Sequence, residues 1–103
     1  MENEAKQIAK TIMQQIGQNS LMFVGFNQPA FFGEAENILG GLQFKCKGKH
    51  VKVGGKCRVE LTARDEYNVI VGTFNSRHGW KEKGRVEGIH ADQLSQAVEE
   101  LIG

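Results

Sequence analysis

Basic residues gather in one stretch of this chain, between positions 44 and 58. The stretch reads FKCKGKHVKVGGKCR and contains both cysteines and one histidine but no acidic residue. Cations fixed on a folded surface attract phosphates and carboxylates. The composition of this stretch therefore predicts a binding surface for an anionic partner. Its cations are Lys45, Lys47, Lys49, Lys52, Lys56 and Arg58.

The spacing of these cations indicates a β-hairpin rather than a flexible basic tail. The first three lysines alternate with other residues, so a strand would project them to one side. Lys52, Lys56 and Arg58 would lie across or beyond a turn, for which Gly54-Gly55 is the candidate. Like charges on neighbouring strands are about 5 Å apart and repel. Such lysines either spread into solvent, where they also prevent edge-to-edge aggregation, or meet an anionic partner.

Cys46, His50 and Cys57 supply ligand types that zinc prefers. Their spacing, C-x3-H-x6-C, keeps only the first pair close, whereas structural zinc sites usually combine two tight pairs. Both cysteines are also in phase with apolar neighbours, as buried structural cysteines are. We therefore expect core thiols rather than a metal site, and no cofactor. A reducing compartment would keep the thiols unpaired.

A second candidate contact is the only tryptophan, Trp80, in the polar segment SRHGWKEKGR. Arg77 and Lys81 flank it, and tryptophan and arginine are frequent in binding hot spots. We expect residues 76–84 to form an exposed loop that presents Trp80 to a partner. The alternative is that its ring folds back over the edge of the sheet.

The sequence carries no recognised catalytic pattern. It lacks a nucleophile elbow, a phosphate-binding glycine loop, H-E-x-x-H and C-x-x-C. His78 could act as an acid or base near neutral pH, but a single histidine without a placed partner gives little support for catalysis. We predict that the protein is not an enzyme and acts by binding.

The chain has 103 residues, and we expect a single domain over residues 1–103. Its formal net charge is only +1, but eleven of the thirteen lysines and arginines fall between positions 45 and 85. No apolar run reaches the ~18 residues that a membrane helix needs. The charged N-terminus, MENEAKQIAK, lacks the apolar core of a secretory signal. We expect a cytoplasmic protein that does not bind a membrane.

Periodic segments at the two ends of the chain predict helices. Apolar residues recur at helical spacing over residues 5–16, where Gly17 suits the C-terminal cap, and again over residues 94–102. Alternating or apolar runs between them predict strands. The expected strands are residues 21–26, 42–46, 57–63 and 67–74, with a weaker fifth at 85–89.

Short connections between the later strands favour an antiparallel sheet of four or five strands. The two helices should pack on one face and leave the other partly wet, which is an α+β fold. Residues 28–41 predict a long loop or a short helical turn. Phe31 and Phe32 within it should pack in the core, because adjacent exposed phenylalanines favour aggregation.

Three segments of the chain carry a resemblance to other proteins: TIMQQIGQNSLMFVGFN, VELTARDEYNVIVGTF and GIHADQLSQAVEELIG. In these segments the chain resembles a family of small uncharacterised proteins encoded by bacteriophages and other mobile elements. The chain departs from the family pattern in residues 28–41 and in its lysine-rich hairpin. The resemblance implies an accessory protein that binds a host nuclease, a defence complex or a nucleic acid, in the manner of some anti-CRISPR proteins.

The interpretation favoured by the sequence is a non-enzymatic binding protein that docks its basic face on an acidic protein surface. It would inhibit a host defence system by occlusion, with Trp80 as an anchor. Direct nucleic-acid binding is the alternative. It is less favoured because the overall charge is near zero and because exposed rings for base stacking are scarce, with only Trp80 and Tyr67 as candidates.

Overall fold

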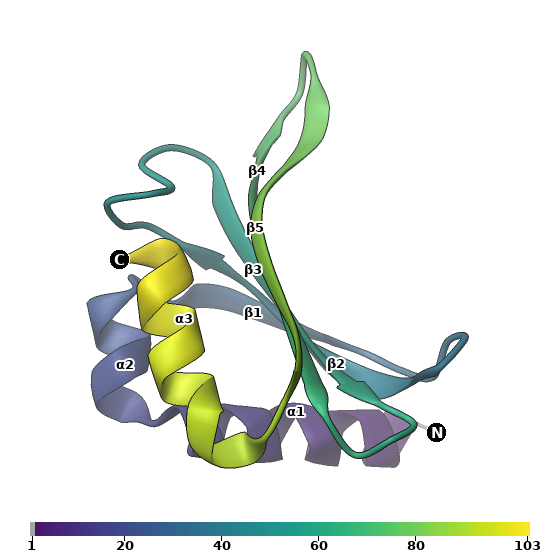
Figure 1. Cartoon of the computed structure of the whole chain (residues 1–103). Helices are drawn as coiled ribbons and strands as arrows, with labels where there is room; N and C mark the ends of the chain where they lie inside the picture. The colour runs from purple at the N-terminus through teal and green to yellow at the C-terminus, as the bar shows by residue number, and fades with distance from the viewer. Residues whose placement is uncertain (1) are drawn as a thin grey trace.

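The computed structural model describes the backbone of residues 2–103 and the side chains of residues 4–103. In this part of the chain, two helices come first, five strands follow, and a 3₁₀ turn leads into a last helix (Figure 1). The elements in order are α1 (Glu2–Ile16), α2 (Gln18–Phe23), β1 (Asn27–Phe32), β2 (Ile38–Cys46), β3 (Gly55–Thr62), β4 (Tyr67–Asn75), β5 (Gly79–Ile89), η1 (Ala91–Gln93) and α3 (Leu94–Ile102).

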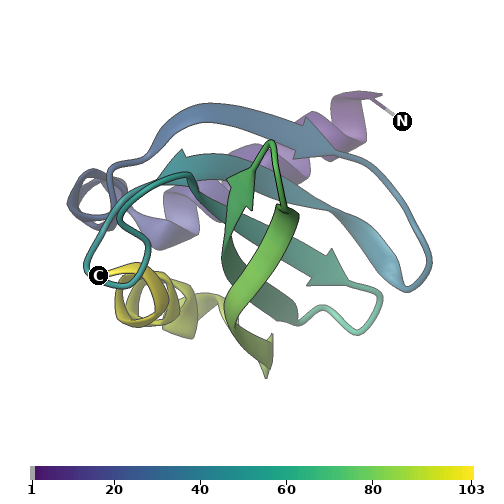
Figure 2. The same ribbon diagram turned by 90° about the horizontal axis from the view of Figure 1, so that it is seen from above.

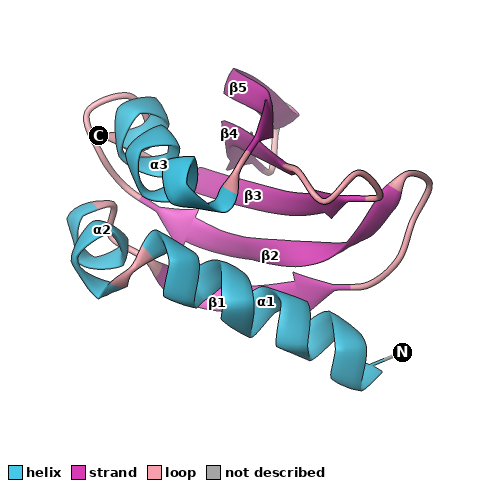
Figure 3. Cartoon of the chain, turned by 60° about the horizontal axis from the view of Figure 1, so that its bottom comes forward, coloured by secondary structure: helices cyan, strands magenta, loops and turns pink. Residues whose placement is uncertain are grey.

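The five strands form one antiparallel sheet in the order β1-β2-β3-β4-β5, so each strand pairs with its neighbours in sequence. The helices lie on one face of this sheet (Figure 3), with α1 against β1 and β2 and α3 against β4 and β5. The prediction of an α+β fold, with terminal helices on one face of an antiparallel sheet, is confirmed.

The core lies between the helices and the sheet. Ile12 of α1 and Val98 of α3 are fully buried against the inward residues of the strands, which include Phe44, Val59 and Val71. Burying an aliphatic or phenyl side chain stabilises the fold by about 1.5–3 kcal/mol. None of the described helices is long and apolar enough to cross a membrane.

The strand predicted for residues 21–26 is wrong, because most of this run belongs to α2 and the turn after it. Gly17, with a φ of +88°, interrupts the helical path after α1, and the chain then resumes as a helix. Ser20 and Val24 are buried at helical spacing, whereas Phe23 is exposed. A short apolar run fits a strand and a helix equally well, so packing decided between them.

The loop or helical turn predicted for residues 28–41 is also wrong, because β1 and the first part of β2 occupy this segment. Pro29 has no backbone N–H to donate to a neighbouring strand. It is tolerated because β1 is an edge strand, where a residue can point this side of its backbone to solvent. Phe31 and Phe32 point to opposite faces of the sheet, and neither is buried. Their expected packing in the core is therefore wrong as well.

The loop predicted for residues 76–84 is mostly strand. β5 begins at Gly79 and pairs with β4 out to the hairpin tip, where Asn75 faces Gly79. The fifth strand is eleven residues long, and it includes Trp80. The tip of the β4–β5 hairpin projects beyond the rest of the sheet (Figure 1).

Candidate functional site

The candidate site lies on the face of the sheet opposite the helices, which we call the open face (Figure 2). Side chains alternate along each strand, so residues between the buried core positions point to this face. Two adjoining hollows lie on it, and we call them the lysine hollow and the central groove. Lys56 and Phe74 line both hollows.

The lysine hollow, of about 520 Å³, collects four of the six predicted cations. Lys45 of β2 lies directly opposite Lys56 of β3, at the ~5 Å separation of cross-strand neighbours. None of the described residues that line the hollow is acidic. The hollow is therefore a concentrated positive site. Its lysines are Lys45, Lys47, Lys52 and Lys56.

Backbone hydrogen bonds hold the loop between β2 and β3 against the helical side of the molecule. The Lys47 N–H donates to the Val24 carbonyl oxygen at 2.9 Å, just after α2. The His50 N–H donates to the Ile102 carbonyl oxygen at 3.0 Å, at the end of α3. These bonds anchor the loop that contributes Lys47 and Lys52 to the hollow, and one of them is made by Lys47 itself.

The predicted hairpin has the right strands but the wrong turn. The connection runs over residues 47–54, and Gly55 already belongs to β3. Lys49 is exposed in this loop but is not among the described residues that line the lysine hollow. A Cβ on Gly48 would lie 2.4 Å from the Ile102 carbonyl oxygen, which explains the glycine at this close approach.

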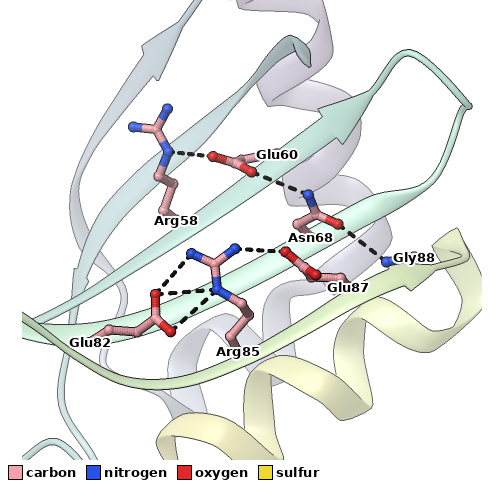
Figure 4. A network of polar contacts seen from close by, with 7 residues as sticks. All are labelled: Arg58, Glu60, Asn68, Glu82, Arg85, Glu87 and Gly88. Atoms are coloured by element: carbon pink, nitrogen blue, oxygen red, sulfur yellow. Dashed lines mark hydrogen bonds and ion pairs between the residues drawn. The ribbon is translucent and has the colours of Figure 1, made fainter. Parts of the chain in front are cut away.

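The central groove, of about 440 Å³, extends from the lysine hollow across β3, β4 and β5. Two polar networks hold the charged side chains of this region (Figure 4). In the first, Arg58 Nε donates to Glu60 Oε2 at 2.9 Å, and Asn68 Nδ2 donates to Glu60 Oε1 at 3.3 Å. The residues that line the groove include Gln43, Arg58, Glu60, Ile70, Trp80, Glu82 and Arg85.

In the second network, the Arg85 guanidinium lies between two carboxylates of its own strand. It donates to Glu82 at 2.8 Å and to Glu87 at 2.7 Å. The hydrogen bond from Arg85 lowers the pKa of Glu82, and the bonds to Glu82 and Glu87 raise the pKa of Arg85. The groove therefore presents paired donors and acceptors rather than a block of like charge.

Aromatic rings lie among these charges on the open face. The guanidinium carbon of Arg58 is 3.8 Å from the centroid of the Phe32 ring, and Lys56 Nζ is 4.8 Å from that of Phe74. Phe74 of β4 lies opposite Trp80 of β5. The two residues are 50% and 45% exposed, so both remain accessible, and Phe74 has a cation beside its ring.

The residues predicted around Trp80 do not form one cluster. Trp80 lines the central groove, whereas Lys81 lies opposite Thr73, out of phase with Trp80, and projects to the other face. Arg77 lies in the hairpin turn, where its N–H donates to Asn75 Oδ1 at 2.7 Å. Neither Arg77 nor Lys81 is among the described residues that line the two hollows.

Sequence reasoning missed Phe74 and considered Tyr67 for stacking instead. Tyr67 is only 6% exposed and belongs to the core, and burial raises its pKa. The alternation of the strand YNVIVGTF contained the signal. The phase opposite to the core residue Val69 holds Ile70 and Phe74, and these two residues line the central groove.

Cys46 and Cys57 are buried free thiols on the core side of the sheet, as the sequence predicts. Burial raises the pKa of Cys46 to about 12. Burial, followed by the nearby charge of Cys46, raises the pKa of Cys57. His50 is exposed, and no three His, Cys, Asp or Glu side chains among the described residues gather as a metal site requires.

Comparison with known protein families, curated proteins and solved structures found no match for this chain. The resemblance to phage-encoded proteins therefore stays a prediction. The site is interpreted from its own geometry and charge.

Proposed function

We propose that this protein acts by binding, and that an anionic partner docks in the lysine hollow. The observation that carries this proposal is the group of four lysines around one hollow with no acidic residue among its described lining. Lys45 and Lys56 repel each other across the β2–β3 pair in the free protein. An anion between the two lysines would reduce that repulsion. Binding would therefore relieve an interaction that destabilises the free folded protein.

Features on both faces of the sheet support binding rather than catalysis. Arg58 and Arg85 are engaged in ion pairs, which orient their donors and the partner carboxylates as fixed polar contacts for a ligand. The thiols of Cys46 and Cys57 are buried, and their raised pKa values keep them protonated near neutral pH. Protonated, inaccessible thiols are poor nucleophiles.

The role implied by the sequence resemblance would use the same surface. An accessory protein of a bacteriophage or another mobile element would block a host defence complex by occupying an anionic contact of that complex. The mechanism would be occlusion, because lysines that neutralise an anion also cover it. Such a role requires no turnover and fits a small protein with a preformed charged hollow.

Retention on immobilised heparin tests the proposal, because heparin is a polyanion without bases or protein side chains. We expect the variant Lys45→Glu/Lys56→Glu to elute at lower salt than the unchanged protein. The matched control is Lys6→Glu/Lys10→Glu, which changes two exposed lysines of α1 and alters the net charge equally. This control should elute later than the variant in the hollow.

Equal loss of retention in the two variants would overturn the proposal, because it would mean that heparin senses only net charge. Circular dichroism and thermal unfolding of both variants verify that each remains folded. Both pairs of lysines are exposed or half-exposed, so neither substitution introduces a charge into the core.

A further inference from the structure

We infer that the anionic partner is a single-stranded nucleic acid that crosses the open face. Its phosphates would lie in the lysine hollow, and its bases would stack on Phe74 and Trp80. This inference rests on the proposed function and specifies its ligand class. Proteins that bind single strands combine a positive groove along the backbone with aromatic rings for the bases, and the open face provides both.

The cations and the rings are neighbours rather than separate features. Phe74 lines both hollows, and Lys56 Nζ lies 4.8 Å from the centroid of its ring. Trp80 lies opposite Phe74 and lines the central groove. A nucleotide with its phosphate at Lys56 would therefore have two half-exposed rings beside its base. The two hollows, of about 520 and 440 Å³, are of a size that accepts small ligands.

The ring of Trp80 packs over a glycine, Gly72, on the neighbouring strand. A Cβ on Gly72 would lie 2.6 Å from Trp80 Cη2, so the indole packs where a larger residue would exclude it. Phe32 packs over Gly41 in the same way at the other side of the face, where a Cβ on Gly41 would lie 2.3 Å from Phe32 Cζ. A ring fixed before binding loses little conformational entropy when a base stacks on it.

The two hollows assign different parts of the nucleotide to different places. A phosphate in the central groove would meet the carboxylates of Glu60 and Glu82, whereas the described lining of the lysine hollow contains no acid. Base edges carry both donors and acceptors, which the paired Arg58–Glu60 and Arg85–Glu82 side chains can match. The phosphate backbone of the nucleic acid therefore belongs in the lysine hollow, and its bases belong in the central groove.

This arrangement favours a single strand over a duplex and over an acidic protein. A duplex keeps its base faces stacked inside, so it offers nothing to the exposed rings of Phe74 and Trp80. An acidic protein surface would use the lysines but would place its carboxylates near those of Glu60 and Glu82. Only unpaired bases use the rings, the paired groups and the lysines together.

The fluorescence of Trp80, the only tryptophan in the chain, provides a direct test. Short oligothymidylate or oligouridylate should quench it, because a base would stack on the indole. An abasic oligodeoxynucleotide of equal length carries the same phosphates and should bind more weakly with little quenching. Phe74→Ala keeps Trp80 and should weaken oligothymidylate binding at least about fivefold, the lower end of the stacking range.

The matched control is Phe31→Ala, a comparably exposed phenylalanine on the helix side of β1, which should bind oligothymidylate unchanged. Both phenylalanine variants should keep their retention on heparin, because they retain all four lysines. Equal affinity for the abasic and base-containing strands, or tighter binding of a duplex or of polyglutamate, would overturn the inference. If the unchanged protein were still retained on heparin in that case, the proposed function would stand. The proposed function is tested separately, by the loss of heparin retention in Lys45→Glu/Lys56→Glu.

Discussion

At the scale of single residues, the two cysteines show how burial prevents a potentially reactive side chain from taking part in chemistry at the surface. Cys57 is fully buried and Cys46 is 5% exposed, both on the core side of the sheet whose open face carries the lysines. Burial in an apolar environment disfavours the thiolate and so raises both thiol pKa values. The cysteines therefore act as small apolar core residues.

The raised thiol pKa values predict that the protein loses stability at alkaline pH. In the unfolded chain the thiols ionise near pH 9.0, whereas in the folded protein Cys46 holds its proton to about pH 12. Their contribution is therefore fully present below pH 9 and is lost as the pH rises towards 12. Above pH 9, the free energy of unfolding should fall by up to ~1.4 kcal/mol per pH unit for each thiol.

Urea unfolding at a series of pH values measures this slope. In Cys46→Ala the free energy of unfolding should fall less steeply with pH than in the unchanged protein. The difference between the two slopes is the contribution of one thiol. All groups other than Cys46 are common to both proteins, so their effects cancel in the comparison. Identical slopes would contradict the assignment of the effect to Cys46.

At the scale of elements, glycines determine how closely neighbouring strands and rings approach. Gly41 of β2 lies under the Phe32 ring of β1, and Gly72 of β4 lies under the Trp80 ring of β5. An aromatic ring that covers a glycine on the adjacent strand fills the space left by the missing side chain. The two outer hairpins of the sheet use this same packing on the open face.

Two glycine substitutions separate steric crowding from backbone strain. In Gly41→Ala the new Cβ would lie 2.2 Å from the Val59 carbonyl oxygen, so we expect a loss of about 2 kcal/mol or more. In Gly79→Ala no atom lies within 4 Å, and only the φ of +74° is unfavourable, at about 1 kcal/mol. Denaturant midpoints measure both, and a larger loss in Gly79→Ala would refute this explanation.

At the scale of the whole molecule, the near-zero net charge and the concentrated hollow have different consequences. A formal charge of +1 gives little long-range attraction for a polyanion. Four lysines around one hollow provide strong attraction at short range. Affinity should therefore depend on contact with the hollow, and it should be sensitive to salt.

The inferred binding of oligothymidylate predicts a definite salt dependence. Each phosphate that a lysine neutralises in a single strand contributes a slope of about −0.7 to the plot of log affinity against log salt. Four contacts would give about −3 for the unchanged protein. Lys52→Gln should reduce the slope by about 0.7, whereas Lys49→Gln, in the same loop but outside the described lining of the hollow, should not. Equal effects of the two changes would contradict the assignment of contacts.

The sequence by itself determined the parts of the fold whose pattern is long or strongly periodic. α1 and α3 follow from stripes of apolar residues, and β2, β3 and β4 follow from alternation, because each pattern fits only one regular structure over its length. The lysine cluster was equally visible, since charge is a property of composition. The placement of Lys45, Lys56 and Arg58 on the face opposite the core followed from the period of two in a strand.

Only the tertiary structure decided the short or ambiguous segments. The apolar run in residues 21–26 fits a helix or a strand, and Pro29 excludes a central strand but not an edge strand. Tertiary contacts made the first the end of a helix and the turn after it, and the second an edge of the sheet. Local sequence preferences there were too weak to outweigh the packing of the whole chain.

The candidate site shows the same division. Six cations and Trp80 were identifiable as residues, but their grouping was not. The position of Trp80 opposite Phe74 depends on the β4–β5 register, which the hairpin tip sets by pairing Asn75 with Gly79. The loop lysines reach the hollow because α2 and α3 hold the loop backbone. The contacts of this loop join segments distant in sequence, so their geometry is set by the packed core rather than by neighbouring residues.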